Sequence, residues 1–202
     1  MTILYFDNNI LITEQNALDL DSYYKVYTLP NGLVKKKERY NKRKLSTIDY
    51  YKDIDETEEQ VKAFLMPLNI SFSILEREFY GKYLIVRGNH YQRGQAQTFS
   101  STRSLFDEED LICSEEIDLD SNKPLFQHTK KYLGKYLDER SVNYCEFYYH
   151  SDGSLMCCDY NYMHDYDSES FDLQRLPWIK STFMLSDEIY NYYLTADLLP
   201  PL

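Results

Sequence analysis

The chain contains 202 residues, of which 33 are Asp or Glu, 22 are Lys or Arg and 21 are tyrosines. A hydrophobic fraction of 43% and a net charge of −11 are typical of a folded, acidic protein and argue against long-range disorder. An excess of this sign repels nucleic acid and anionic lipid, and no apolar run approaches the roughly 18–20 residues that span a bilayer.

The first strands are expected between residues 22 and 51. Residues 22–29 are rich in aromatic and β-branched side chains, Pro30-Asn31-Gly32 supplies a tight reversal, and two further runs complete a three-strand meander. The lysines and arginines at 35–44 favour an edge strand that lysine protects from aggregation. Contact with RNA or DNA through the same charges is the alternative.

A helix is predicted over residues 57–68. The stretch Thr57-Glu58-Glu59-Gln60 has the form of a capping box, and apolar residues then recur at spacings of three and four. Pro67 is expected to end the regular part of the helix. Residues 70–102 return to an alternating pattern, which predicts further strands.

The segment 107–120 holds eight acidic residues and no Lys or Arg. Such a run predicts a solvated loop or helix face, and the alternative is a patch that steers a basic partner. Residues 127–137 are expected to form a short helix because their apolar residues cluster at helical spacing, although Gly134 weakens it.

The clearest hairpin joins residues 143–149 to residues 154–162 through Ser151-Asp152-Gly153. An acidic loop is expected at 164–172, and a helix capped by Ser186 is expected at 186–194.

Turn spacing and alternation predict an α+β fold, with a mainly antiparallel meander sheet of about seven to ten strands and two or three short helices. We expect a single domain over residues 1–202, with a subdivision near 104–122 as the alternative. The four cysteines form no CxxC pair, and the first residues lack the basic segment of a secretory signal. A cytoplasmic location with reduced thiols is therefore expected.

Residues 27–34 and 149–156 share a layout of aromatic strand, polar turn ending in Gly, and aliphatic strand. This layout resembles the MORN-like hairpin repeats of bacterial antitoxin and immunity proteins. The whole chain, acidic, rich in tyrosine and without a catalytic motif, also resembles the immunity proteins of bacterial polymorphic toxin systems. The resemblance implies a protein that neutralises a toxin by binding it, and it transfers no individual site residue.

The densest polar cluster lies between residues 150 and 172, where His150, Cys157, Asp159 and His164 could converge on a metal. No CxxC or HExxH spacing supports such a site, so we expect no metal, no cofactor and no catalysis. Two alternatives stay open: an enzyme of unrecognised class with a site at 150–167, and a structural protein whose aromatic hairpins self-assemble edge to edge.

These patterns favour a module that binds a basic protein, for example a cognate toxin, and occludes the basic site of that partner. Tyrosines would supply the anchoring contacts, while nucleic acid and membranes are not expected partners and the oligomeric state stays open. The expected contact residues come from the two acidic segments and their neighbours: Asp107, Glu108, Glu109, Asp110, Glu115, Glu116, Tyr160, Tyr162, Asp165, Tyr166, Asp167 and Glu169.

Overall fold

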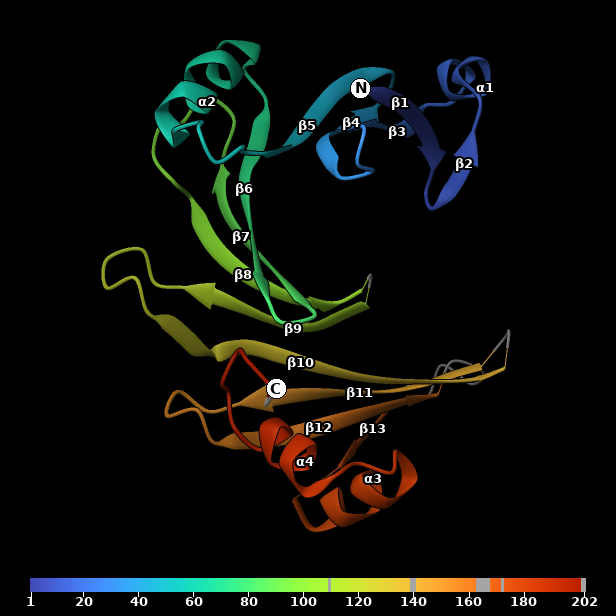
Figure 1. The fold of residues 1–202 in the computed structure, drawn as a ribbon, viewed down its shortest axis with the longest axis vertical. Helices are drawn as coiled ribbons and strands as arrows, with labels where there is room; N and C mark the ends of the chain where they lie inside the picture. Colours follow the sequence, from blue (N-terminus) through green and yellow to red (C-terminus); the bar gives the residue numbers. More distant parts are fainter. Residues whose placement is uncertain (109, 139–140, 163–167, 172, 201–202) are drawn as a thin grey trace. The chain divides into compact units, whose positions relative to one another are not determined.

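Consecutive β-strands make up most of the chain (Figure 1). The structure, a computed structural model, describes residues 1–108, 110–138, 141–162, 168–171 and 173–200. Within these ranges 13 strands are hydrogen-bonded in the order β13-β12-β11-β10-β9-β8-β7-β6-β5-β4-β3-β1-β2. The predicted α+β class with a mainly antiparallel meander is confirmed. The expected numbers were too low, because the described residues form 13 strands and four short α-helices.

The strands are β1 (Thr2–Asp7), β2 (Ile10–Ile12), β3 (Ser22–Thr28), β4 (Val34–Asn41), β5 (Lys44–Tyr51), β6 (Ser71–Tyr80), β7 (Tyr83–Tyr91), β8 (Ser100–Asp107), β9 (Asp110–Ile117), β10 (Pro124–Asp138), β11 (Ser141–Tyr149), β12 (Leu155–Tyr162) and β13 (Ser168–Phe171). The helices are α1 (Glu14–Asp19), α2 (Glu58–Leu65), α3 (Leu176–Thr182) and α4 (Asp187–Tyr193), with short 3₁₀ turns at Met66–Leu68 and Leu173–Arg175.

The chain divides into two compact units. The N-terminal unit comprises Met1–Arg77 and Arg87–Ser101, and the C-terminal unit comprises Glu78–Val86 and Thr102–Leu202. By sequence the N-terminal unit carries 13 basic and 12 acidic residues, a net charge of +1. The C-terminal unit carries nine basic and 21 acidic residues, a net charge of −12. The acidic excess of the protein therefore belongs to the C-terminal unit.

The expected meander and the expected helix of the N-terminal unit are both confirmed. Strands β3, β4 and β5 pair antiparallel, and Thr57 and Gln60 form the capping box of α2. Strands β5 and β6 run parallel, and parallel neighbours need a crossover connection, which α2 supplies. Its Val61 and Leu65 are buried in a cluster with Ile48. Each buried aliphatic side chain contributes about 2 kcal/mol to stability.

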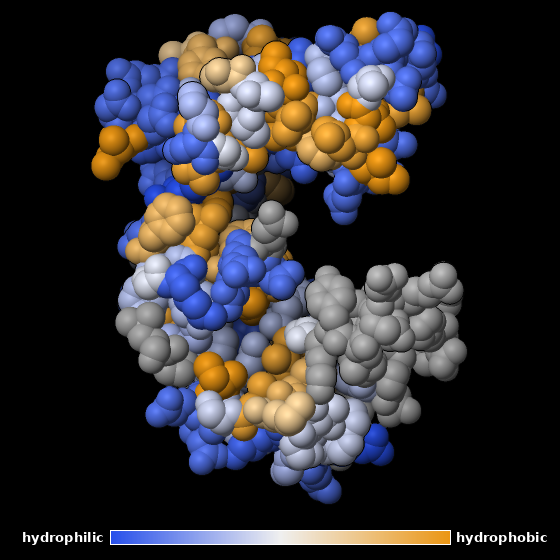
Figure 2. Space-filling model, turned by 45° about the vertical axis from the view of Figure 1, so that its right-hand side comes forward, coloured by the Kyte–Doolittle hydropathy of each residue, from blue (hydrophilic) through white to orange (hydrophobic). Residues whose placement is uncertain are grey.

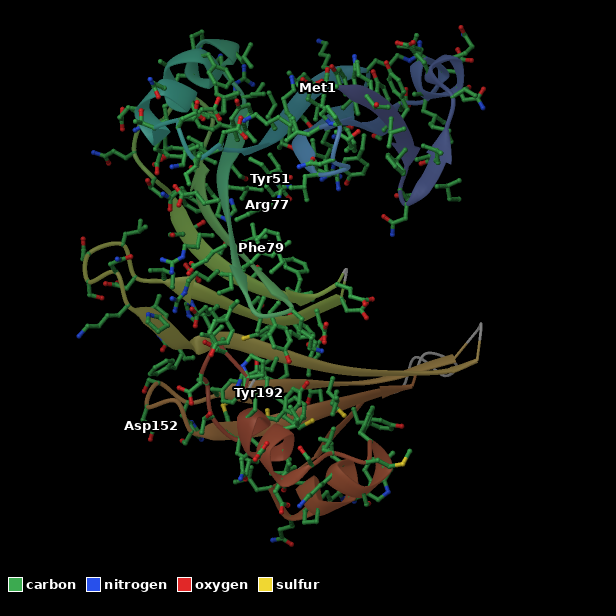
Figure 3. The ribbon with its side chains drawn as sticks, in the orientation of Figure 1. Met1, Tyr51, Arg77, Phe79, Asp152 and Tyr192 are labelled. Atoms are coloured by element: carbon green, nitrogen blue, oxygen red, sulfur yellow. The ribbon has the colours of Figure 1, made fainter. Side chains whose placement is uncertain are left out.

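Cations of the N-terminal unit are paired with carboxylates and aromatic rings. Buried Lys35 places Nζ 2.7 Å from carboxylate oxygens of both Asp53 and Glu56. Burial opposes ionisation of Glu56, but the Asp53 N–H and the Lys35 ammonium together lower the pKa of this carboxyl to about 2. Figure 3 shows Arg77 beside Tyr51, with the guanidinium carbon 3.7 Å from the ring centroid. The basic stretch is thus partly used inside the fold. Its expected position in an edge strand was wrong, because β4 pairs with β3 on one side and with β5 on the other.

In the C-terminal unit, helices α3 and α4 pack on strands β11 and β12 (Figure 1). Their shared core is aromatic: Phe147 of β11 stacks on Tyr193 of α4 with 4.7 Å between ring centroids. The expected hairpin is confirmed as β11 and β12, and the expected helix is confirmed as α4, whose Ser186 side chain accepts from the N–H of Ile189.

Three local expectations in this unit were wrong. Residues 127–137 form part of strand β10, because pairing with β9 and β11 on both sides outweighs a weak helical spacing that already contained Gly134. The acidic segment 107–120 contains strand β9 in place of a loop or helix. Within the expected loop at 164–172, Ser168–Phe171 forms strand β13 against β12.

Candidate functional site: an acidic pocket in the C-terminal unit

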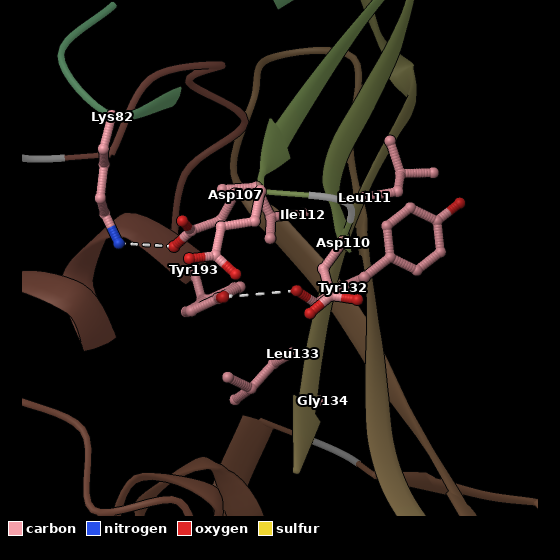
Figure 4. Close-up of a pocket in the computed structure, with 10 residues that line it drawn as sticks. Lys82, Asp107, Asp110, Leu111, Ile112, Tyr132, Leu133, Gly134 and Tyr193 are labelled. Carbon is pink, nitrogen blue, oxygen red and sulfur yellow. Dashed lines mark hydrogen bonds and ion pairs between the residues drawn. The ribbon is translucent and has the colours of Figure 1, made fainter. Parts of the chain in front are cut away.

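A pocket of about 610 Å³ opens where β8 turns into β9, beside β10 (Figure 4). This volume is within the range of small-molecule and side-chain binding sites. The residues that line it are Lys82, Asp107, Glu108, Asp110, Leu111, Ile112, Tyr132, Leu133, Gly134 and Tyr193. All belong to the C-terminal unit, and they come from the β6–β7 turn, the β8–β9 turn, β9, β10 and α4.

Three carboxylates and a single ammonium give the described lining a net negative charge. Lys82 Nζ lies 2.5 Å from Asp107 Oδ2, and this hydrogen bond raises the pKa of Lys82. Glu108 and Asp110 are exposed beside the paired carboxylate. The pair therefore neutralises one carboxylate and leaves two to set the potential of the pocket.

The remaining lining is apolar and held by the core of the unit. Tyr193 is 6% exposed and donates its hydroxyl to the carbonyl of Tyr132 at 3.3 Å. Leu133 packs against the same aromatic cluster. Gly134 and Tyr132 share the opposite face of β10, where a Cβ added at Gly134 would meet no atom within 4 Å. An apolar wall with charged groups at its rim suits a side chain that has both an aliphatic stem and a cationic head.

The three carboxylates of the described lining all come from the turn between β8 and β9. Among the residues whose side chains the structure describes, no group of three or more His, Cys, Asp or Glu could hold a metal ion. The arrangement therefore suits an extended cation, such as a guanidinium or an ammonium on an alkyl stem, which several carboxylates can contact at once.

The structure brings together three of the predicted contact residues, Asp107, Glu108 and Asp110. Two others from the same segment lie elsewhere. Glu115 is 3% exposed and accepts from Arg103 through both Nε and Nη2, so its expected surface position was wrong. Glu116 is partly exposed, with an oxygen 2.7 Å from His128 Nδ1. Alternation along β9 places these two neighbours on opposite faces.

The second group of predicted contact residues is only partly described. Tyr160 is 2% exposed and meets the Trp178 ring edge-on at 5.2 Å, so its expected role as a surface anchor was wrong. Tyr162 lies in β12 and Glu169 in β13, and only the backbone of these two residues is described. Four predicted residues lie outside the described residues: Glu109, Asp165, Tyr166 and Asp167.

The alternative metal or enzyme site at 150–167 is likewise only partly described. Cys158 is buried at 1% exposure, while Cys157 and Asp159 are partly exposed, as alternation along β12 requires. His164 lies outside the described residues.

The tyrosines are structural in most of the described chain, which corrects the expectation that they form a binding surface. Every tyrosine whose side chain is described is buried or partly buried. Several donate to carboxylates inside the fold: Tyr50 to Glu56 at 2.6 Å, Tyr5 to Glu14 at 2.5 Å. Tyrosine and acid are therefore enriched together partly because they are partners. Figure 2 shows the face of the molecule where hydrophobic residues lie in small groups between hydrophilic ones.

Lys82, Tyr132, Leu133, Gly134 and Tyr193 were not anticipated as site residues. No spacing rule connects a lysine in one turn with a helix residue more than one hundred positions later. The turn at 107–110 was the only part of this pocket with a signal in the sequence, namely its run of acids.

The two stretches with a shared layout form turns with the same hydrogen bonds. In the first, the N–H of Gly32 donates to the Leu29 carbonyl; in the second, the N–H of Gly153 donates to the His150 carbonyl. Both glycines have a φ of +85°. The described helices include none that is both long and apolar enough to cross a membrane. No protein-family model matches this chain, and no curated protein or solved structure matches it either.

Proposed function

We propose that this protein is a binding module that holds a basic partner protein through the acidic pocket. In its most specific form the proposal is an immunity-type protein, located in the cytoplasm, that neutralises a toxin by occluding the basic site of that toxin. The supporting observation is the gathering of Asp107, Glu108 and Asp110 around one opening in the unit that carries a net charge of −12.

The binding step follows from the charge and shape of the pocket. The field of the acidic unit draws a basic surface toward it and raises the association rate. A lysine or arginine side chain then inserts its stem beside Tyr132 and places its head between Glu108 and Asp110. Because Lys82 holds Asp107 at 2.5 Å, the incoming cation has two carboxylates to itself.

Peptide titration tests this mechanism directly. Three blocked peptides that differ only in a central Arg, Lys or Glu are titrated by calorimetry at low salt. We expect the Arg and Lys peptides to bind, the Glu peptide to fail, and the affinity to fall steeply as salt screens the charges.

A matched pair of double variants locates the binding. Glu108→Gln with Asp110→Asn removes two charges at the pocket, and Asp120→Asn with Glu188→Gln removes two charges from exposed positions outside it. The pocket variant should lower the affinity for the Arg peptide by about fivefold to tenfold, since exposed ion pairs contribute about 0.2–1 kcal/mol each. Equal effects of the two variants would show that net charge, and not this pocket, binds the peptide.

A further inference from the structure

A second cavity, of about 340 Å³, lies in the N-terminal unit, and its lining includes Asp49, Ser71, Ser73, His90, Gln92 and Phe99. These residues come from β5, β6, β7 and the segment that leads into β8. The acidic pocket lies in the other unit, so this cavity is a separate site.

The strand register explains why the polar groups meet. In the parallel pair β5–β6, Asp49 lies opposite Ser73. Their neighbours Ile48 and Phe72 are buried under α2, so alternation directs Asp49 and Ser73 to the face that α2 leaves uncovered. Strand β7 is the next neighbour of β6, and it carries His90 on this face.

Ser73 and His90 are in direct contact. His90 Nδ1 lies 2.9 Å from Ser73 Oγ, which is the distance expected between a nucleophile and its general base. Burial lowers the pKa of His90, and the charge of Asp49 opposes that effect. The imidazole is therefore neutral near pH 7 and can accept a proton from the serine hydroxyl.

Gly88 makes room for this histidine. A Cβ at position 88 would lie 3.3 Å from both Cε1 and Nε2 of His90 and 2.8 Å from Cδ2 of Leu75. A contact below 3.0 Å is not tolerated without movement, so any larger residue would displace the imidazole or the leucine. The absence of a side chain at position 88 thus leaves room for the imidazole beside Leu75.

The neighbouring serine is held differently. Ser71 Oγ accepts the backbone N–H of Arg93 at 3.2 Å, a bond that draws electron density away from the hydroxyl oxygen. Both serines line the cavity, and the imidazole of His90 contacts the hydroxyl of Ser73. This contrast distinguishes two serines of one strand and provides a matched control.

We infer that Ser73 is a nucleophile activated by His90, and that the cavity admits small, uncharged esters. Ser73 Oγ attacks the ester carbonyl carbon while His90 takes the hydroxyl proton. The carbon–oxygen bond to the alcohol then breaks, and His90 returns the proton to the leaving oxygen. Water hydrolyses the acyl-serine by the same steps in turn, which releases the acid and regenerates the hydroxyl.

The other lining groups fit this chemistry. Gln92 belongs to the lining, and a glutamine side-chain amide can donate to the oxyanion of a tetrahedral intermediate. Asp49 favours the imidazolium that forms during the attack and disfavours anionic substrates. Phe99 is 59% exposed and offers an apolar surface to the acyl or alcohol group.

Covalent labelling tests the inference. The native protein is treated with a fluorophosphonate probe, from which the serine oxygen displaces fluoride at phosphorus, and the adduct is located by peptide mass spectrometry. We expect one adduct on Ser73, and a matching hydrolysis of p-nitrophenyl acetate. Ser73→Ala should abolish the adduct, while Ser71→Ala should be labelled at the wild-type rate.

Two further variants separate activation from mere accessibility. His90→Gln should slow labelling by about a hundredfold, the lower range for loss of a general base, with an unchanged circular dichroism spectrum. Asp49→Asn should lower the pH midpoint of the labelling rate, because Asp49 is the carboxylate in the described lining that supports the charged imidazole. No adduct on native protein, an adduct that persists in Ser73→Ala, or unchanged labelling in His90→Gln would each overturn the inference.

Discussion

Lys82 neutralises Asp107 at the rim of the acidic pocket, with Nζ 2.5 Å from Oδ2 and 65% of the lysine side chain exposed. This ammonium is the one cation in the described lining, so it opposes the entry of a second cation. Lys82→Gln should therefore strengthen binding of the Arg peptide, by up to about fivefold for a single exposed charge. Lys123 is exposed and lies outside the pocket, so calorimetry on Lys123→Gln controls for the change in net charge. A weaker affinity in Lys82→Gln would mean that the lysine itself contacts the ligand.

Lys131 connects the sheet to the C-terminal end of α4. It is fully buried and donates to the carbonyl of Tyr192, in the last turn of α4 where carbonyls lack helical partners, and to the carbonyl of Thr195 just beyond the helix. Lys131→Met should leave these carbonyls unpaired and destabilise the protein by about 1–3 kcal/mol. Hydrogen exchange should rise first in α4, and unchanged exchange there would exclude the capping role.

The pH dependence of this lysine has a definite sign. Burial lowers the pKa of Lys131 to about 7, although the carboxylates of Asp197 and Glu115 act in the opposite direction, whereas in the unfolded chain the pKa is near the ordinary value of 10.5. Between pH 7 and pH 10.5 the unfolded state binds more protons, so stability rises with pH in that window. A neutral amine still has two N–H groups for the two carbonyls. The stability difference between wild type and Lys131→Met should therefore grow from pH 7 to pH 9, and a shrinking difference would contradict the burial argument.

The two matching turns give a paired test of backbone strain and contact. Gly32 and Gly153 share a φ of +85°, which costs an alanine roughly 1–2 kcal/mol at either position. An alanine Cβ at 153 would also lie 3.3 Å from Cδ2 of Phe126, whereas at 32 it would meet no atom within 4 Å. Urea unfolding should show a larger loss for Gly153→Ala than for Gly32→Ala. Equal losses would mean that Phe126 moves without cost.

Elements with a local signal could be predicted from the sequence. Helix α2 has its capping box at Thr57 and Gln60, and α4 has its cap at Ser186, because a cap depends on residues three positions apart. The hairpin at 149–155 could be predicted from Gly153, because its turn also depends on residues a few positions apart. In each case the controlling interaction lies within one turn of the chain.

Elements controlled by distant partners could not be predicted. Strand β10 has helical spacing in its sequence, and only its pairing with β9 and β11 makes it a strand. The acids at 107–110 pointed to the pocket, but Tyr193 reaches it through the packing of α4 on β11. The tyrosines were assigned to a surface because composition cannot reveal that Tyr50 and Glu56 are partners 2.6 Å apart.

The most direct test of the proposed function fills the pocket without changing its charge. Gly134→Phe places a ring beside Tyr132, on the same face of β10, where a Cβ at position 134 meets no atom within 4 Å, and Gly134→Ala is the matched control. Titration with the Arg peptide should show binding in Gly134→Ala and a loss of at least about tenfold in Gly134→Phe, the order expected when a buried side-chain contact is removed. Equal affinity in the two variants would contradict the account, because the peptide would then bind outside the acidic pocket.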